Sequence, residues 1–256
     1  MFYFTLERWE PIMILQTGMR TDIPAFYAEW FTNRIKDGYV LVRNPYNPVQ
    51  VTKYRLDPTF VDLIGFCSKN PAPMLQYMDL LKPFGMYWFV TITPYGTDIE
   101  PHVPDKEKVI DSFLALSEIV GPDAMAWRYD PIFLDETYTV DYHLKAFEHI
   151  AARLCDATKT CVISFIDLYQ KVRKNFPEVR SVGKDDRIFL GNDIGAYNTC
   201  PHLCRYCYAN YDEQTVRQNY ANHDPHSPFL IGNLRPEDVI HEAVQKSWVD
   251  GQMRLF

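Results

Sequence analysis

The chain has 256 residues, of which 47% are hydrophobic and 23% are charged, a balance typical of a globular protein with a full core. Its formal charge of −7 argues against a broad nucleic-acid-binding surface. No apolar run reaches the roughly 20 residues that a membrane-spanning helix needs, and the start of the chain is not a signal peptide. We therefore expect a cytoplasmic protein that binds neither membranes nor nucleic acid.

Short apolar runs alternate with helix-length segments along most of the chain. Strands are predicted at residues 12–17, 39–42, 60–66, 86–93, 124–127, 161–166 and 187–191. Helices are predicted at 24–38, 71–85, 105–121, 140–155, 167–176 and 235–248. Alternation of buried strands with amphipathic helices predicts an α/β protein with a parallel sheet.

Seven strands favour a (β/α) barrel-like parallel sheet, either complete or lacking one unit. A glycine-rich dinucleotide fingerprint is absent, which weakens the doubly wound alternative. We expect an N-terminal extension at 1–12, the barrel-like domain at 13–191, and a cysteine-cluster segment with C-terminal helices packed on the barrel at 192–256.

Polar side chains follow six of the predicted strands. They are Arg20 and Asp22, Arg43 and Asn44, Lys69 and Asn70, Thr93 and Tyr95, Arg128 and Asp130, and Asp167. Barrel enzymes keep their active sites at the carboxyl ends of the strands, so we expect a shared site. Its candidate catalytic residues are Arg20, Asp22, Arg128 and Asp130, because arginine suits bidentate contacts with a carboxylate or phosphate. The alternative is that these residues pair with one another as internal salt bridges.

Three of the six cysteines lie close together in the stretch TCPHLCRYCYAN, residues 199–210. Cys200, Cys204 and Cys207 read C-x₃-C-x₂-C, and Tyr206 precedes the last of them. In a reducing compartment such a cluster indicates metal binding or catalysis. Three thiolates can hold one corner of a cubane iron–sulfur cluster and leave its fourth iron without a protein ligand.

Three other interpretations of this cluster stay open. A structural zinc site would add His202 or His223 as the fourth ligand. A redox dithiol would use Cys204 and Cys207, although a thioredoxin-like context is missing. The thiols could also carry no metal at all. The remaining cysteines, Cys67, Cys155 and Cys161, show no ligand spacing, and we expect them to be incidental.

The pattern C-x₃-C-x-aromatic-C resembles the signature of the radical S-adenosylmethionine superfamily. In that superfamily the open iron binds the amino and carboxylate groups of S-adenosylmethionine. One electron then cleaves the molecule to methionine and a 5′-deoxyadenosyl radical, which abstracts hydrogen from a substrate. The resemblance implies a 4Fe-4S cluster on Cys200, Cys204 and Cys207. We expect Tyr206, Arg43 and Asn198 to contact the cofactor.

A narrower resemblance covers nearly the whole chain. The stretches RTDIPAFYAEWF, GYVLVRNPYNP, KNPAPML, TPYGTDIEP, WRYDPI, ISFIDLY and DIGAYNTCPHLCRYCYAN together resemble the bacterial family known as domain of unknown function 1848, from about Met13 to about Asp238. That family carries radical-SAM-like cysteines near its C-terminus, and its reaction is unassigned. The resemblance therefore implies a cofactor and not a substrate.

This chain departs from both patterns. Only 49 residues follow Cys207 (256 minus 207), so the barrel precedes the cysteines, whereas radical-SAM enzymes usually place them after the first strand. A glycine-glycine-glutamate segment is absent, and the stretch at 177–192 is shorter than in the family.

Our leading interpretation is an iron–sulfur protein of radical-SAM type that acts on a small molecule and takes its electron from a donor. The alternative is a non-catalytic protein in which zinc or a cluster fastens the C-terminal segment. A third interpretation is a metal-independent barrel enzyme that uses its arginine and aspartate side chains.

Overall fold

The computed structural model describes residues 13–168, 170–176 and 192–245. The expected extension at 1–12 and the expected strand at 187–191 lie outside these residues. No helix in the described part is long and apolar enough to span a membrane.

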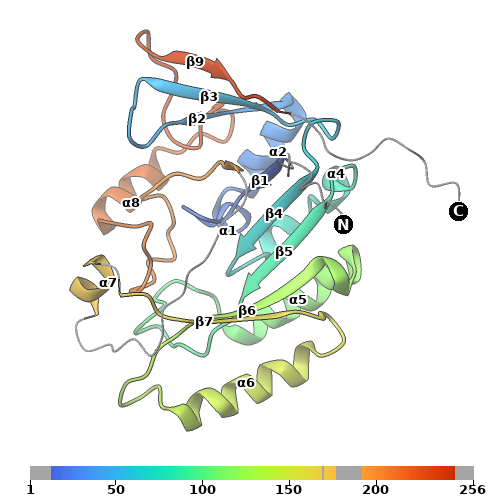
Figure 1. Ribbon diagram of the computed structural model, residues 1–256, viewed down its shortest axis with the longest axis vertical. Coiled ribbons are helices and arrows are strands. Elements are labelled where there is room, and N and C mark those ends of the chain that lie inside the picture. Colours follow the sequence, from blue (N-terminus) through green and yellow to red (C-terminus); the bar gives the residue numbers. More distant parts are fainter. Residues whose placement is uncertain (1–12, 169, 177–191, 246–256) are drawn as a thin grey trace, which may run out of the picture.

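A six-stranded parallel sheet forms the centre of the molecule (Figure 1). Its strands are β1 (Ile14–Gln16), β4 (Leu63–Ser68), β5 (Met86–Thr91), β6 (Met125–Ile132), β7 (Cys161–Phe165) and β8 (Asn192–Asp193). Their order is β7-β6-β5-β4-β1-β8, and every neighbouring pair is parallel. The predicted parallel sheet is thus confirmed. Within the described residues β7 and β8 are its two ends, and the pairing that would close a barrel is not among them.

Helices flank this sheet. They are α1 (Ile23–Phe26), α2 (Ala28–Asp37), α3 (Ala72–Leu75), α4 (Met78–Leu81), α5 (Lys106–Val120), α6 (Val140–Leu154), α7 (Gln170–Asn175) and α8 (Glu213–Ala221), with a short 3₁₀ helix at Pro122–Ala124. The helices predicted at 24–38 and 71–85 are each divided in two. Helix α8 was not predicted from the sequence, although Asp212 is a good N-cap for it and accepts a hydrogen bond from Thr215 N–H.

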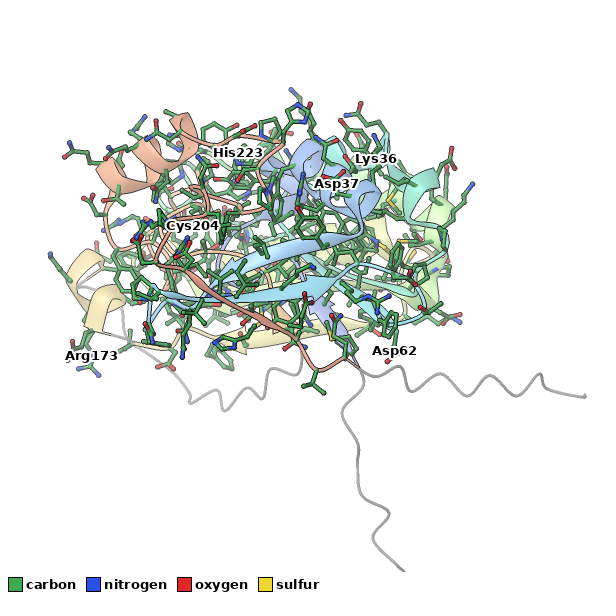
Figure 2. The ribbon with its side chains drawn as sticks, turned by 90° about the horizontal axis from the view of Figure 1, so that it is seen from above. Lys36, Asp37, Asp62, Arg173, Cys204 and His223 are labelled. Carbon is green, nitrogen blue, oxygen red and sulfur yellow. The ribbon has the colours of Figure 1, made fainter. Side chains whose placement is uncertain are left out.

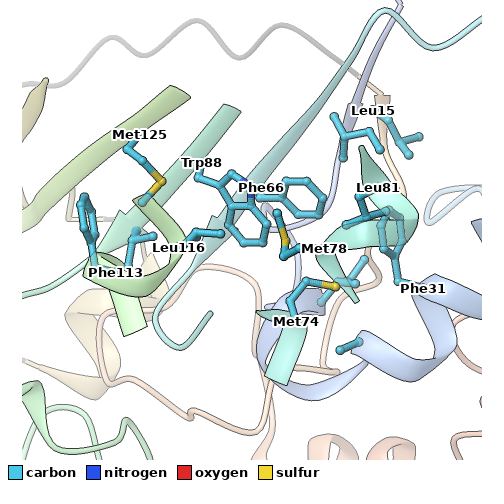
Figure 3. Packing of buried hydrophobic residues seen from close by; sticks show 14 of the residues in the cluster. Leu15, Phe31, Phe66, Met74, Met78, Leu81, Trp88, Phe113, Leu116 and Met125 are labelled. Atoms are coloured by element: carbon cyan, nitrogen blue, oxygen red, sulfur yellow. The ribbon is translucent and has the colours of Figure 1, made fainter. Parts of the chain in front are cut away.

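The main core lies between the sheet and the helices (Figure 3). Phe66 of β4 and Trp88 of β5 stack with their ring centroids 3.9 Å apart. Helix α5 shows how the sequence builds this layer: Asp105 caps its first turn, and Ile110 and Phe113 are fully buried. Burying each large side chain contributes about 1.5–3 kcal/mol. The core therefore holds the strand ends in fixed positions.

The strand predicted at 39–42 does not join the central sheet, which corrects the expected barrel order. It is β2 (Tyr39–Arg43), which pairs antiparallel with β3 (Gln50–Arg55) in a separate three-stranded sheet. The connection at 44–49 is too short for a parallel crossover, which needs a dozen or more residues. Asn44 Oδ1 accepts from the backbone N–H groups of Tyr46 (2.9 Å) and Asn47 (3.2 Å) and turns the chain back.

The C-terminal helix predicted at 235–248 is wrong in its described part. Residues 239–242 form β9 (Val239–Glu242), which pairs parallel with β3. Asp238 fixes the turn before it, since it accepts from Arg235 N–H (2.7 Å) and forms an ion pair with Arg43. The exposed edge of β3 supplies backbone partners that a helix could not use. In Figure 1 this second sheet and α6 lie at opposite ends of the molecule.

Candidate functional site

A cavity of about 780 Å³ opens at the carboxyl ends of the parallel strands. All six strands contribute to its wall near their ends, through residues 18–22, 67–69, 91, 128, 130, 131, 166, 167 and 193. The wall is completed by residues 45, 46, 197, 200, 202–204 and 206–210. The carboxyl edge of a parallel sheet is where α/β proteins bind ligands, and this volume is typical of small-molecule sites.

The cysteine loop, residues 199–210, is held against this cavity at several points. The Tyr27 hydroxyl donates to the Thr199 carbonyl, and Tyr208 OH donates to Met19 O (2.5 Å). Asn210 Nδ2 donates to Cys200 O (2.7 Å) across the loop. Leu203 has a φ of 53°, in the left-handed region that leucine rarely adopts. These contacts anchor the loop on the segment that follows β1 and on the end of α1. In Figure 2 Cys204 lies well apart from Asp62, the residue before the start of β4, as expected for a loop at the opposite, carboxyl end of the strands.

The three thiols of the loop are partly buried and face the same cavity. Burial raises the pKa of Cys200 and Cys204, and the neighbouring thiolates raise the pKa of Cys200 further. Two of the sulfurs accept hydrogen bonds from backbone N–H groups. Ala209 N–H donates to Cys207 Sγ (3.4 Å), and the backbone N–H of His202 partly offsets the rise in the pKa of Cys200. Hydrogen bonds to sulfur are one of the means by which proteins tune iron–sulfur clusters.

The described residues contain no group of three or more His, Cys, Asp or Glu side chains that could hold a metal ion. The three thiols thus share one cavity without gathering around a single ion. Their donor chemistry, soft and able to become anionic, suits zinc or an iron–sulfur cluster.

Asp22, predicted to be catalytic, is a buried clamp between three segments of the wall. Its Oδ1 accepts from Ala25 N–H (3.1 Å) and so caps α1, while its Oδ2 accepts from Lys69 N–H (2.7 Å) and lies 3.0 Å from His202 Nε2. One carboxylate therefore joins the loop after β1, the end of β4 and the cysteine loop. Its contacts are those of a positioning residue.

The other predicted catalytic residues line the cavity in ion pairs. Arg20 Nε and Asp193 Oδ2 are 2.5 Å apart, and Arg20 Nη2 also donates to Asp193 O (2.5 Å). Arg128 pairs with Asp130, and its buried Nε has no hydrogen-bond partner in the described part of the protein. The internal pairing considered from the sequence is thus present, and Arg128 still carries a donor group that the wall leaves unsatisfied.

A buried carboxylate that the sequence interpretation missed lies beneath the cysteine loop. Glu100, 1% exposed, accepts from Lys69 Nζ (2.8 Å), Thr93 Oγ1 (2.7 Å), Lys106 Nζ and the Tyr206 hydroxyl. Burial alone would raise the pKa of Glu100, but the two lysines lower it to about 2. The sequence holds no spacing signal for Glu100, because it lies nine residues past the end of β5.

The Glu100 carboxylate gives the fold a pH-dependent contribution to stability. Its pKa is lowered from 4.5 to about 2, so the contribution is fully present above about pH 4.5 and is lost as the pH falls through about 2. We expect urea unfolding of the wild type and of Glu100→Gln to differ by about 3 kcal/mol near neutral pH. The difference should shrink steadily below about pH 4.5, and a constant difference down to about pH 2.5 would contradict the assigned pairing.

Cys67, expected to be incidental, also lines the cavity. It is a half-buried residue of β4, and Arg128 Nη1 lies 3.6 Å from its sulfur. Burial raises the pKa of the Cys67 thiol, and Arg128 opposes the rise. Its place one residue before the end of a parallel strand was the available signal. By contrast, Cys155 and Cys161 are exposed and do not line the cavity.

Two predicted cofactor contacts lie outside the cavity wall. Arg43 belongs to β2, where it pairs with Asp238 and lies over the Phe229 ring at 4.9 Å. Asn198 has a φ of 55° and its Oδ1 accepts from the N–H groups of Tyr211 and Asp212, so it shapes the start of the loop. Tyr206, the third predicted contact, lines the cavity and bonds to Glu100.

The histidines considered as zinc ligands have other partners. His202 lies between Asp22 and the His102 carbonyl oxygen, which is 3.3 Å from its Nδ1. His223 lies outside the cavity wall, where its Nδ1 is 2.8 Å from Leu230 O.

These features define an α/β protein with a ligand-sized cavity at the carboxyl edge of a parallel sheet and a cysteine loop across it. Residues 14–192 match the family model described as Domain of unknown function (DUF1848), and the chain belongs to this family. The match ends before the cysteine loop, whereas the sequence resemblance was expected to reach about Asp238. Comparisons with curated proteins and with solved structures find no match.

Proposed function

We propose that Cys200, Cys204 and Cys207 bind a 4Fe-4S cluster and that the chain is an enzyme of radical-SAM type with a small-molecule substrate in the cavity. When bound, such a cluster supplies one electron for the cleavage of S-adenosylmethionine, which starts hydrogen abstraction from a substrate. An external donor returns the electron. We place this chemistry in the cytoplasm, where thiols stay reduced.

The observation that carries the proposal is the position of the three thiols. All of them line the cavity to which every strand of the parallel sheet contributes. Thiolates are soft, negatively charged donors, which is the ligand chemistry that an iron–sulfur cluster needs. A cubane held by three thiolates keeps one iron without a protein ligand, and that iron would lie at the cavity wall where a small molecule can bind.

The chain's own residues have distinct parts in this proposal. Tyr206 lines the cavity beside the proposed ligands, and its hydroxyl donates to Glu100. Arg128, with its unsatisfied Nε, is our candidate to bind a carboxylate of the cofactor or substrate. Arg20 and Asp130 complete the same wall, and Asp22 positions it.

The structural zinc alternative is supported less well. A Cys₃His site needs His202 or His223, and these are engaged by Asp22 and by the Leu230 carbonyl. A metal-independent enzyme would use the same arginine and aspartate wall, and it would keep its activity when the cysteines are replaced.

The test is metal analysis of protein purified without oxygen. We expect about four irons and four sulfides per chain, and their loss in a Cys200/Cys204/Cys207 triple alanine variant. The matched control replaces Cys155 and Cys161, which are exposed and outside the cavity, and should keep full metal content. One zinc without sulfide, or no metal after reconstitution with iron and sulfide, would refute the proposal.

A further inference from the structure

Two lysines share a single carboxylate beneath the cysteine loop. Lys69 Nζ lies 2.8 Å from Glu100 Oε1, and Lys106 Nζ binds the other oxygen, Oε2. The lysine side chains are only 14% and 26% exposed, and that of Glu100 is fully buried. Two ammonium groups and one carboxylate leave one positive charge in a place that is largely shielded from water.

This surplus charge lies next to the proposed ligands. Tyr206, between Cys204 and Cys207 in sequence, donates its hydroxyl to Glu100, and Lys69 Nζ lies 5.4 Å from the centre of the Tyr206 ring. Lys69 lines the cavity together with Cys204, and the charges of both lysines and of Glu100 act on that thiol.

An unbalanced buried cation costs stability unless an anion is close to it. Thiolates are the anions that the loop can supply. Three thiolates around a divalent ion, or around the doubly charged core of an oxidised cubane, carry one net negative charge. The surplus in the lysine network has the opposite sign and the same size.

We propose that the Lys69–Glu100–Lys106 network is a built-in counter-charge for a metal–thiolate centre in the cysteine loop, with Lys106 as a positioning residue that acts through Glu100. This inference rests on the proposed metal binding by the loop, but it does not require that the metal be iron. Charges and hydrogen bonds around a metal site tune both its affinity and its reduction potential.

The test compares substitutions that change the network charge in opposite directions. Lys106→Met removes a positive charge, and Glu100→Gln removes a negative one. On the reduced, metal-free full chain, we expect Lys106→Met to weaken Co²⁺ binding at least threefold in a chelator competition, and Glu100→Gln to strengthen it. On the iron-loaded protein the reduced state should become at least threefold less favoured in Lys106→Met, about 28 mV for a one-electron couple, and more favoured in Glu100→Gln.

The controls separate charge from structural damage. Lys106→Arg keeps the charge and should behave as the wild type. Lys82→Met removes an exposed lysine of a pair with Asp79, outside the cavity wall, and should change neither value. A merely structural network would give changes of the same sign in Lys106→Met and Glu100→Gln, and that result would overturn the inference, as would the absence of any effect.

The outcomes also distinguish this inference from the proposed function. Opposite changes in Co²⁺ affinity, in a protein that assembles no iron–sulfur cluster, would support the counter-charge and refute the radical-SAM proposal. A normal iron–sulfur cluster whose reduction potential is unchanged in both variants would support the proposed function and refute the counter-charge. A wild-type chain that binds neither Co²⁺ nor iron would overturn both.

Discussion

Replacing Asp22 with alanine is expected to destabilise the protein by about 4 kcal/mol. The substitution removes the cap of α1, which alone costs about 0.5–2 kcal/mol. It also leaves Lys69 N–H and His202 Nε2 without the acceptor that now lies 2.7 and 3.0 Å away, and each unsatisfied buried group costs about 1–3 kcal/mol. Urea unfolding monitored by circular dichroism measures the total.

Asp22→Asn separates the two contributions. The asparagine keeps one oxygen for the cap at Ala25 but presents an amide group where Oδ2 now accepts. We expect the free energy of unfolding of Asp22→Asn to lie between those of the wild type and Asp22→Ala. Equal stability of Asp22→Ala and the wild type would refute the role of Asp22 as a clamp. The catalytic role predicted for Asp22 from the sequence would then be the better explanation of its position.

The central sheet was predictable because buried parallel strands carry their signal in short continuous apolar runs. β5 is an example, since it was expected at 86–93 and lies at Met86–Thr91; β7 was likewise expected at 161–166 and lies at Cys161–Phe165. The hairpin of β2 and β3 has a similar apolar run, but its pairing depends on a short turn that the alternation pattern ignores. β9 was mistaken for a helix because its strand state comes from the edge of β3, a contact about 190 residues away in sequence.

The cavity wall was partly predictable for a geometric reason. The carboxyl ends of parallel strands lie at one edge of the sheet. The meeting of Arg20, Lys69, Arg128 and Asp130 could therefore be predicted without knowing the tertiary fold. Arg43 failed the same rule because its strand belongs to the other sheet. Glu100 and Lys106 were not predictable, because Glu100 lies between β5 and α5, Lys106 begins α5, and the Tyr206 hydroxyl reaches Glu100 from the cysteine loop about 100 residues further along the chain.

The close approach of the ends of β1 and β4 also explains why a glycine is needed at position 18. An added Cβ at this position would overlap the carbonyl oxygen and the Cβ of Cys67, which belong to the neighbouring strand β4. Backbone and Cβ atoms cannot move aside cheaply, so the end of β1 would have to separate from β4. We expect Gly18→Ala to cost at least about 3 kcal/mol, at the upper end of the cost of overpacking.

Gly96→Ala is the matched control for this prediction. There the nearest atom to the added Cβ is the terminal Oδ1 of Asp98, 2.9 Å away, which accepts from the Tyr138 hydroxyl (2.8 Å) and can yield by a small shift that keeps this hydrogen bond. We expect a change below about 1 kcal/mol in the same urea titration. Because Gly18 and Cys67 both line the cavity, we expect Gly18→Ala to retain less of the proposed metal than Gly96→Ala when both are loaded under the same conditions. Two variants of equal stability and equal metal content would show that the β1–β4 junction can widen without cost, and the cavity floor would then be less rigid than its packing indicates.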